Sequence, residues 1–221
     1  ASLQHGVILG SSCEVAEQAV LHGPLTAGMR NQFRQFAMIG GHSSHLNATR
    51  NGHIAIGDDC VFEIGSIVLA PRGHDDGSEG AGARPGVTQI ENGVFVHMRA
   101  EVSHDCTLED GVDLAGQLSG FCHVMRGAKV MKGATLHQFT TVGAGAFLAM
   151  GAQVRHDVLP YCVFDGRTAT LDRISLRRSG VSALQADELQ RFYEGCFASS
   201  SACYVRSLEE VLPALAARGD D

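Results

Sequence analysis

Apolar residues recur every six positions over most of the chain, and this period constrains the fold more than any other sequence feature. Neither the helical period of 3.6 nor the alternation of a strand demands one apolar residue in six. A parallel β-helix with three short flat faces per coil does, because one side chain per face must point into a narrow interior. The hexads therefore predict a solenoid from residue 7 to about 160. Its interior positions are Val15, Leu21, Ala27, Phe33, Ile39, Ile56, Phe62, Val68, Ile90, Val96, Val102, Leu108, Leu114, Leu118, Val124, Val130, Leu136, Val142, Leu148 and Val154.

The composition agrees with a narrow interior. The chain has 27 Gly, no Trp and only 6% aromatic residues, so its core must consist of Val, Ile, Leu and Ala. A formal charge of −7 without a basic stripe argues against nucleic-acid binding. No window approaches the roughly 18 apolar residues of a membrane span. Seven scattered cysteines without CxxC pairs, and no leading apolar segment, lead us to expect a soluble cytoplasmic protein with reduced thiols.

The hexads are interrupted in three places. Residues 41–53 (GHSSHLNATRNGH) and 70–87 (APRGHDDGSEGAGARPGV) fit no repeat, so we expect them to be loops ejected from the coil wall. Loops on a rigid scaffold commonly carry binding groups. The step from Leu114 to Leu118 is four residues instead of six, which predicts one face shortened by two residues.

The pattern changes after Pro160. A sequence starting at Ser182, with apolar Leu184, Leu189 and Phe192, predicts an N-capped helix. The capping box Ser207-Leu-Glu-Glu predicts a second helix through Leu215. We therefore expect an all-β fold, a left-handed parallel β-helix of hexapeptide repeats over residues 1–166, followed by a short α-helical region over 167–221. Such helices cover the open edge of the solenoid.

Four segments carry a family resemblance. AEVSHDCTLEDG, LSGFCHV, GATLHQF and DVLPYCVFDGRTATLDRISLRRSGVS follow one another between residues 100 and 182. In order and spacing they resemble the bacterial UDP-N-acetylglucosamine O-acyltransferases that start lipid A biosynthesis. The resemblance implies a homotrimer with active sites in the clefts between neighbouring β-helices. It also implies an acyl donor carried by acyl carrier protein, with coenzyme A left open, a small-molecule acceptor and no separate cofactor.

His104 is the candidate general base. Acyl transfer from a thioester to a hydroxyl requires removal of the hydroxyl proton, and histidine titrates near neutral pH. Its place two residues after the interior Val102 puts it near a corner of the coil. The resemblance offers Asp105 as partner of the base, although neighbours in an extended stretch point to opposite faces, so a purely structural Asp105 is equally compatible. Gly120 matches the glycine whose amide is assigned to the oxyanion, and a glycine that only relieves a corner is the alternative.

Other matched positions concern the substrates. His137 and Gln138 match a pair that lines the cleft near the acceptor and the pantetheine. Arg167, Arg177 and Arg178 are candidates for phosphate binding, or simply a solvated basic face. Thirteen residues after His137, the family has a position where Gly admits a longer acyl chain and Met shortens the groove. That position is Met150, which predicts an acyl chain of medium or shorter length, with hydroxylation of the chain left open.

The acceptor positions depart from the family pattern. An Asp and a Lys that hold the sugar nucleotide become His45 and Asn47, and a His three residues before the base becomes Glu101. Another cleft His becomes Phe121, although His123 is close. An Asn-x-Glu element falls on Asp172 and Ile174. These changes weaken the assignment of UDP-GlcNAc as acceptor more than the assignment of acyl transfer.

Two other functional classes are alternatives to an acyltransferase. A zinc hydratase of the γ-carbonic anhydrase type needs three converging histidines, and one of those positions is Arg99 here. A non-catalytic scaffold would not require His104, Gly120 and the His137–Gln138 pair in family order.

Overall fold

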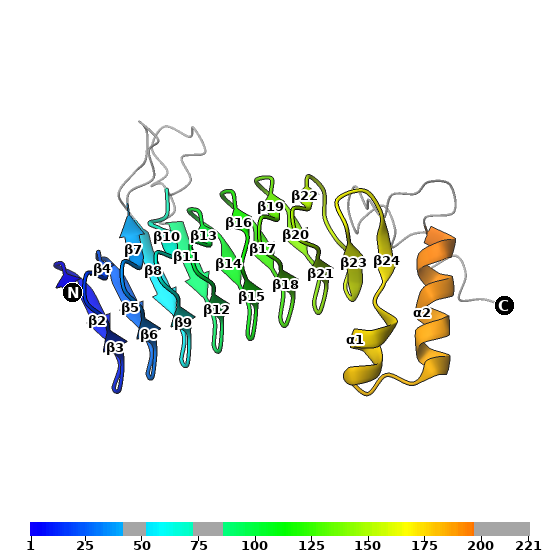
Figure 1. Cartoon of the computed structure of the whole chain (residues 1–221), viewed down its shortest axis with the longest axis horizontal. Helices are drawn as coiled ribbons and strands as arrows, with labels where there is room; N and C mark the ends of the chain where they lie inside the picture. Colours follow the sequence, from blue (N-terminus) through cyan, green and yellow to red (C-terminus); the bar gives the residue numbers. More distant parts are fainter. Residues whose placement is uncertain (42–51, 73–85, 197–221) are drawn as a thin grey trace, which may run out of the picture.

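The computed structural model describes residues 1–41, 52–72 and 86–196. Each coil of the solenoid contributes short strands to three sheets, which we call A, B and C, and strands of successive coils pair in parallel (Figure 1). Sheet A contains β1 (Ser2–Leu3), β4 (Val20–Leu21), β7 (Met38–Gly41), β10 (Ile67–Leu69), β13 (Glu101–Val102), β16 (Gln117–Leu118), β19 (Thr135–Leu136) and β22 (Gln153–Val154).

The other two sheets complete the wall. Sheet B contains β2 (Val7–Leu9), β5 (Leu25–Ala27), β8 (Gly52–Ile56), β11 (Gly86–Ile90), β14 (Thr107–Leu108), β17 (His123–Val124) and β20 (Thr141–Val142). Sheet C contains β3 (Glu14–Val15), β6 (Gln32–Phe33), β9 (Val61–Phe62), β12 (Phe95–Val96), β15 (Asp113–Leu114), β18 (Lys129–Val130), β21 (Phe147–Leu148), β23 (Cys162–Phe164) and β24 (Ala169–Leu171).

The predicted hexad residues fill the interior, except that Val15 in the first coil is only half-buried. Leu21, Val102 and Leu136 are fully buried, and the rings of Phe33 and Phe62 stack with centroids 5.0 Å apart. Burial of one apolar side chain per face and coil removes a continuous strip of hydrocarbon from water, which is the main stabilising contribution to a fold of this kind.

The shortened coil is also confirmed. Val102 pairs with Leu118, sixteen residues further along the chain, whereas Leu118 pairs with Leu136, eighteen residues further. The two missing residues come from the turn between β15 and β16. Because β13 pairs with β16, the residues after β13 and those after β16 lie on adjacent coils at the same corner.

Both predicted interruptions fall between strands that meet at the corner between sheets A and B, which we call the AB corner. Where β7 extends to Gly41 and where β8 and β11 begin at Gly52 and Gly86, their described ends are strand and not loop, whereas residues 42–51 and 73–85 lie outside the described residues. The first interruption lies between β7 and β8, and the second lies between β10 and β11. His45 and Asn47 fall in the first of these segments, outside the described residues. The strands that follow the two interruptions, β8 and β11, are in register from their first residues, since Gly52 pairs with Gly86.

The carboxyl-terminal end of the solenoid is closed by a hairpin and two helices (Figure 1). Strand β24 pairs antiparallel with β23, so strands continue to Leu171, past residue 166. Helix α1 spans Arg173–Arg178, and α2 spans Ala183–Cys196. The Tyr193 hydroxyl donates to the Pro160 carbonyl at 3.0 Å, which anchors α2 to the last coil.

The predicted cap of α2 is confirmed, since the Gln185 N–H donates to Ser182 Oγ at 3.3 Å. Leu184 was expected on the apolar face of this helix but is 76% exposed, and Ala186 is the buried residue of the first turn. The helix predicted from Ser207 lies outside the described residues. Neither described helix has the length and hydropathy needed to cross a membrane.

Candidate active site

His104 and Asp105 form a hydrogen-bonded pair at the AB corner. His104 Nδ1 lies 2.9 Å from Asp105 Oδ2, and the two side chains are only 13% and 7% exposed. Asp105 has a φ of 57°, in the left-handed region, because the chain turns here from sheet A to sheet B. This turn, rather than an extended strand, brings the neighbouring side chains to one side. A carboxylate accepts the Nδ1 proton, so Nε2 is the basic nitrogen of the neutral imidazole.

Asp105 is held by residues on both sides of the second interruption. The N–H of Arg72, which precedes the interruption, donates to Asp105 Oδ2 at 2.9 Å. The Asp105 N–H donates at 2.9 Å to Oγ1 of Thr88, which follows the interruption on β11, and the Thr88 hydroxyl donates to the Leu69 carbonyl. Because Thr88 is fully buried, this network holds the carboxylate, and through it the imidazole, in one orientation.

Gly120 lies directly against the imidazole. A Cβ atom added to Gly120 would lie 2.4 Å from His104 Cε1 and 2.7 Å from Nε2. The Phe121 N–H donates to the His104 carbonyl at 3.1 Å, which confirms that the two corners lie on adjacent coils. The φ of Gly120 is not in the left-handed region, so the backbone conformation does not require a glycine. The close approach of the His104 ring does. In the described part of the chain, the Gly120 N–H has no acceptor.

Two phenylalanines border the base. The rings of His104 and Phe121 meet edge to face with centroids 5.2 Å apart, and Phe121 stacks on Phe139 at 4.9 Å. Phe139 occupies the equivalent turn one coil further on, since its N–H donates to the Gly120 carbonyl. Phe121 therefore gives the candidate base an aromatic neighbour. Phe139 was not predicted as a site residue, although its spacing of eighteen from Phe121 equals one coil.

His137 and Gln138 also lie at the AB corner, where the chain passes from β19 of sheet A to β20 of sheet B. His137 directly follows β19 and is exposed, and its Nδ1 lies 3.2 Å from the Gln138 carbonyl oxygen. A hollow of about 190 Å³ opens beside it on the outer face of sheet A. Ser119, Gln153 and Arg155 also line this hollow. The sequence alone does not identify Arg155 as a site residue, because only the pairing of coils shows that it adjoins His137.

Glu101 and His123 flank the AB corner from its two sides. Glu101 lies on β13 and accepts a hydrogen bond of 3.4 Å from the Ser103 hydroxyl. His123 lies on β17, and its Nε2 is 2.8 Å from Glu109 Oε1. Burial raises the pKa of Glu109, but hydrogen bonds from the Arg126 N–H and from His123 outweigh it, so the pKa is lowered overall. Within this chain, His123 therefore pairs with Glu109 and not with His104, the candidate base.

Met150 and Arg167 lie away from the AB corner. Met150 is 75% exposed in the turn between β21 and β22, at the corner between sheets C and A. Arg167 is exposed in the turn between β23 and β24, where its N–H donates to Asp165 Oδ1 at 2.8 Å. A single chain therefore does not bring either residue to the AB corner.

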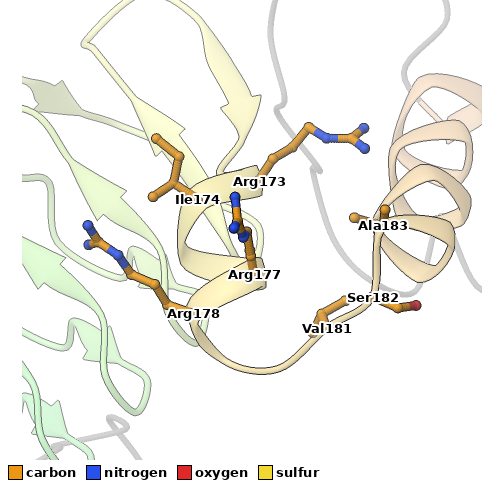
Figure 2. A pocket seen from close by; sticks show the side chains of 8 residues that line it. Arg173, Ile174, Arg177, Arg178, Val181, Ser182 and Ala183 are labelled. Carbon is orange, nitrogen blue, oxygen red and sulfur yellow. The ribbon is translucent and has the colours of Figure 1, made fainter.

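Arg177 and Arg178 line a second hollow, of about 670 Å³, between α1 and α2 (Figure 2). Arg173 also lines it and forms an ion pair with Asp187. Helices α1 and α2 lie at the carboxyl-terminal end of the solenoid, whereas β13 and β14 lie near its middle (Figure 1). The predicted arginines are therefore gathered at the carboxyl-terminal end, away from His104.

Asp172 is the N-cap of α1. Its Oδ1 accepts hydrogen bonds from the Ile174 and Ser175 N–H groups at 3.1 and 2.9 Å. Burial raises the pKa of Asp172, but hydrogen bonds from the Ser175 hydroxyl and from these N–H groups prevail and lower it. Asp172 thus has a capping role, while Ile174 is exposed and lines the large hollow.

No group of three or more His, Cys, Asp or Glu side chains converges in a metal-binding arrangement within residues 1–41, 52–72 and 86–196.

Curated relatives share the name acyl-[acyl-carrier-protein]–UDP-N-acetylglucosamine O-acyltransferase, while no family model matches the chain. The protein of this name from Gloeothece citriformis is 27% identical over 187 residues, which cover 82% of this chain and 64% of the relative. The one from Anaeromyxobacter dehalogenans strain 2CP-1 is 31% identical over 153 residues, covering 66% of this chain and 56% of the relative. The chain thus spans less than two thirds of either relative.

Solved structures support the fold. The UDP-N-acetylglucosamine acyltransferase from Campylobacter jejuni matches with a TM-score of 0.78 at 18% identity, over 99% of this chain and 82% of the other. The enzyme from Francisella novicida matches with a TM-score of 0.68 at 21% identity, over 99% and 83%. These matches confirm the predicted left-handed parallel β-helix. The chain is therefore similar in sequence to proteins named as UDP-N-acetylglucosamine O-acyltransferases and shares the fold of their solved structures.

Proposed function

We propose that the protein is an acyltransferase, which moves an acyl group from a thioester to a hydroxyl, with His104 as the general base. The observation that carries this proposal is the His104–Asp105 pair, fixed at 2.9 Å and packed against Gly120, in a chain homologous to named acyltransferases. A solvated surface histidine would need neither the buried carboxylate nor a glycine under its ring.

The proposed reaction uses residues of the AB corner. His104 Nε2 removes the proton of the acceptor hydroxyl as its oxygen attacks the thioester carbon. The carbon–sulfur bond then breaks, and the imidazolium returns the proton to the leaving thiolate. Asp105 stabilises the imidazolium, since a hydrogen bond to a charged partner is stronger than one between neutral groups. The Gly120 N–H is the proposed donor to the oxyanion of the tetrahedral intermediate.

The proposed substrates follow the names of the relatives, which are acyl-[acyl-carrier-protein] and UDP-N-acetylglucosamine. Acyl carrier protein is the proposed donor, and coenzyme A is the alternative carrier. UDP-N-acetylglucosamine, or a related sugar nucleotide, is the proposed acceptor. The altered position Phe121, whose ring contacts His104, supports the alternative of a different hydroxyl or amine acceptor, since a phenyl ring makes no polar contact.

We also propose a homotrimer. Met150 lies at the corner between sheets C and A and His104 lies at the AB corner, so the two corners can meet only through a second copy of the chain. Ligand sites are generally concave and partly desolvated, which a single solenoid wall is not. Light scattering should give a trimer, and a fully active monomer at micromolar concentration would contradict the proposal.

The proposed reaction is tested by incubating the protein with acyl carrier protein thioesters and a panel of sugar nucleotides, with products identified by mass spectrometry. His104→Ala should lower kcat by about 10²–10⁴-fold, the usual contribution of a general base. The matched control is His97→Ala, because His97 pairs with Asp113 at 2.6 Å on sheet C, away from the AB corner. Retention of more than about a tenth of kcat in His104→Ala would exclude general-base catalysis by this residue. No turnover with any acceptor would instead favour a non-catalytic scaffold.

A further inference from the structure

Arg155 lines the hollow beside His137 and contributes a positive charge to that hollow. The hollow measures about 190 Å³ and includes Ser119, Thr135, His137 and Gln153 on the outer face of sheet A. Arg155 is exposed, and no acidic side chain in the described ranges pairs with it. A guanidinium beside a hollow with hydroxyl, imidazole and amide groups is suited to an anionic ligand with several hydrogen-bonding groups.

The pairing of coils relates this hollow to the base. His104 follows β13, and Arg155 follows β22, three coils further along sheet A. The His137 N–H donates to the Val154 carbonyl, so Arg155 lies beside His137 in the next coil. With neighbouring strands about 4.8 Å apart, three coils separate His104 and Arg155 by about 14 Å.

This separation selects between two sources of a phosphate group. In an acyl donor of either proposed kind, a pantetheine arm joins the thioester to a phosphate, and its bond lengths give an extended reach of about 15 Å. In a nucleotide sugar, by contrast, only the hexose ring lies between the reacting hydroxyl and the nearer phosphate, about 6 Å by the same bond lengths. The distance from His104 to Arg155 therefore matches the donor.

We propose that Arg155 binds the phosphate of the donor's phosphopantetheine arm, which lies along the outer face of sheet A with its thioester at His104. This inference rests on the proposed acyltransferase function. Ser119, Thr135 and Gln153 supply hydrogen-bonding groups for the amides of the arm, since they line the hollow between the two ends. The arm would then enter from the carboxyl-terminal end of the solenoid.

The test compares two donors that differ only in the phosphate, S-acyl phosphopantetheine and S-acyl pantetheine. The wild-type protein should use the phosphorylated donor with a kcat/KM about tenfold higher, and Arg155→Ala should abolish this preference while leaving the acceptor KM unchanged. Arg155→Lys should retain part of it, since a lysine binds phosphate as a point charge. The matched control is Lys129→Ala, which removes an exposed cation from sheet C and should keep the full preference.

Calorimetric binding of phosphopantetheine and pantetheine, without acceptor, keeps this test independent of turnover. If no donor is turned over but Arg155→Ala still weakens only phosphopantetheine binding, the acyltransferase assignment fails and the phosphate site stands. Equal weakening of both compounds, or of neither, would overturn the site. Weakened binding of UDP with unchanged phosphopantetheine binding would assign Arg155 to the acceptor and also overturn the proposal.

Discussion

His104 and Asp105 are neighbours in the sequence, yet their side chains meet at 2.9 Å because Asp105 adopts a left-handed backbone conformation at the AB corner. The same Asp105 oxygen accepts the Arg72 N–H. The carboxylate therefore has two separable roles, one toward the imidazole and one toward the backbone at Arg72.

Asp105→Asn should separate these roles. The amide retains an oxygen acceptor but not the negative charge that stabilises the imidazolium, and a hydrogen bond to a charged group contributes about 1.5–3 kcal/mol. We expect kcat to fall by about 10- to 100-fold with the melting temperature nearly unchanged. Asp113→Asn, in the exposed His97–Asp113 pair, is the control and should leave kcat unchanged. An Asp105→Asn enzyme with wild-type kcat would reduce Asp105 to a structural residue.

Gly120→Ala should displace the base. The added Cβ would lie 2.4 Å from His104 Cε1, so the ring must move, and such overpacking costs about 1–3 kcal/mol. We expect a lower melting temperature and a kcat loss of at least about tenfold, because a displaced base loses its transition-state geometry.

A double-mutant cycle isolates the contact between Gly120 and His104. Once His104→Ala has removed the ring, adding Gly120→Ala should cost almost no further stability. If Gly120→Ala destabilised both backgrounds equally, the glycine would be required by the backbone and not by the imidazole.

The regular features of this molecule could be predicted from the sequence, because they repeat. The hexads located the interior residues, and the four-residue step from Leu114 to Leu118 located the short coil that places Gly120 against His104. The conformation of Asp105 could not be predicted, since a left-handed turn at a non-glycine residue leaves no clear sequence signal. Arg155 and Phe139 became site residues only through the pairing of coils.

Acidification should unfold the first turn of α1. The pKa of Asp172 lies below its ordinary value of 3.8, because hydrogen bonds from Ser175 and Ile174 outweigh the effect of burial. A lowered pKa means that the cap stabilises the helix above that ordinary value and loses this effect as the pH falls through the folded pKa. We expect hydrogen-exchange protection of the Ile174 and Ser175 amides, corrected for intrinsic rates, to fall below about pH 4.

Asp172→Ala provides the comparison for this acid transition. It should lower the protection at neutral pH by the equivalent of about 1 kcal/mol and remove the acid transition, because the titrating cap is gone. If the wild-type amides kept full protection at pH 3, the ionised cap would contribute nothing to the helix.

Met150→Gly should change the preferred length of the acyl chain. Met150 is 75% exposed at the corner between sheets C and A, so in a trimer its side chain is available to close a groove that leads from a neighbour's AB corner. A thioether side chain occupies volume that methylene groups would otherwise fill, and each buried CH₂ contributes about 0.8 kcal/mol to binding. The wild-type protein should therefore prefer a medium or shorter chain, and Met150→Gly should shift the maximum of kcat/KM toward longer donors. The comparison uses one donor series for both proteins, with Met98→Gly as the control because Met98 lies at the same type of corner several coils away. An unchanged order of preference in Met150→Gly would show that Met150 does not limit the groove, whereas a shift in Met98→Gly as well would indicate a general effect of losing a methionine from this corner.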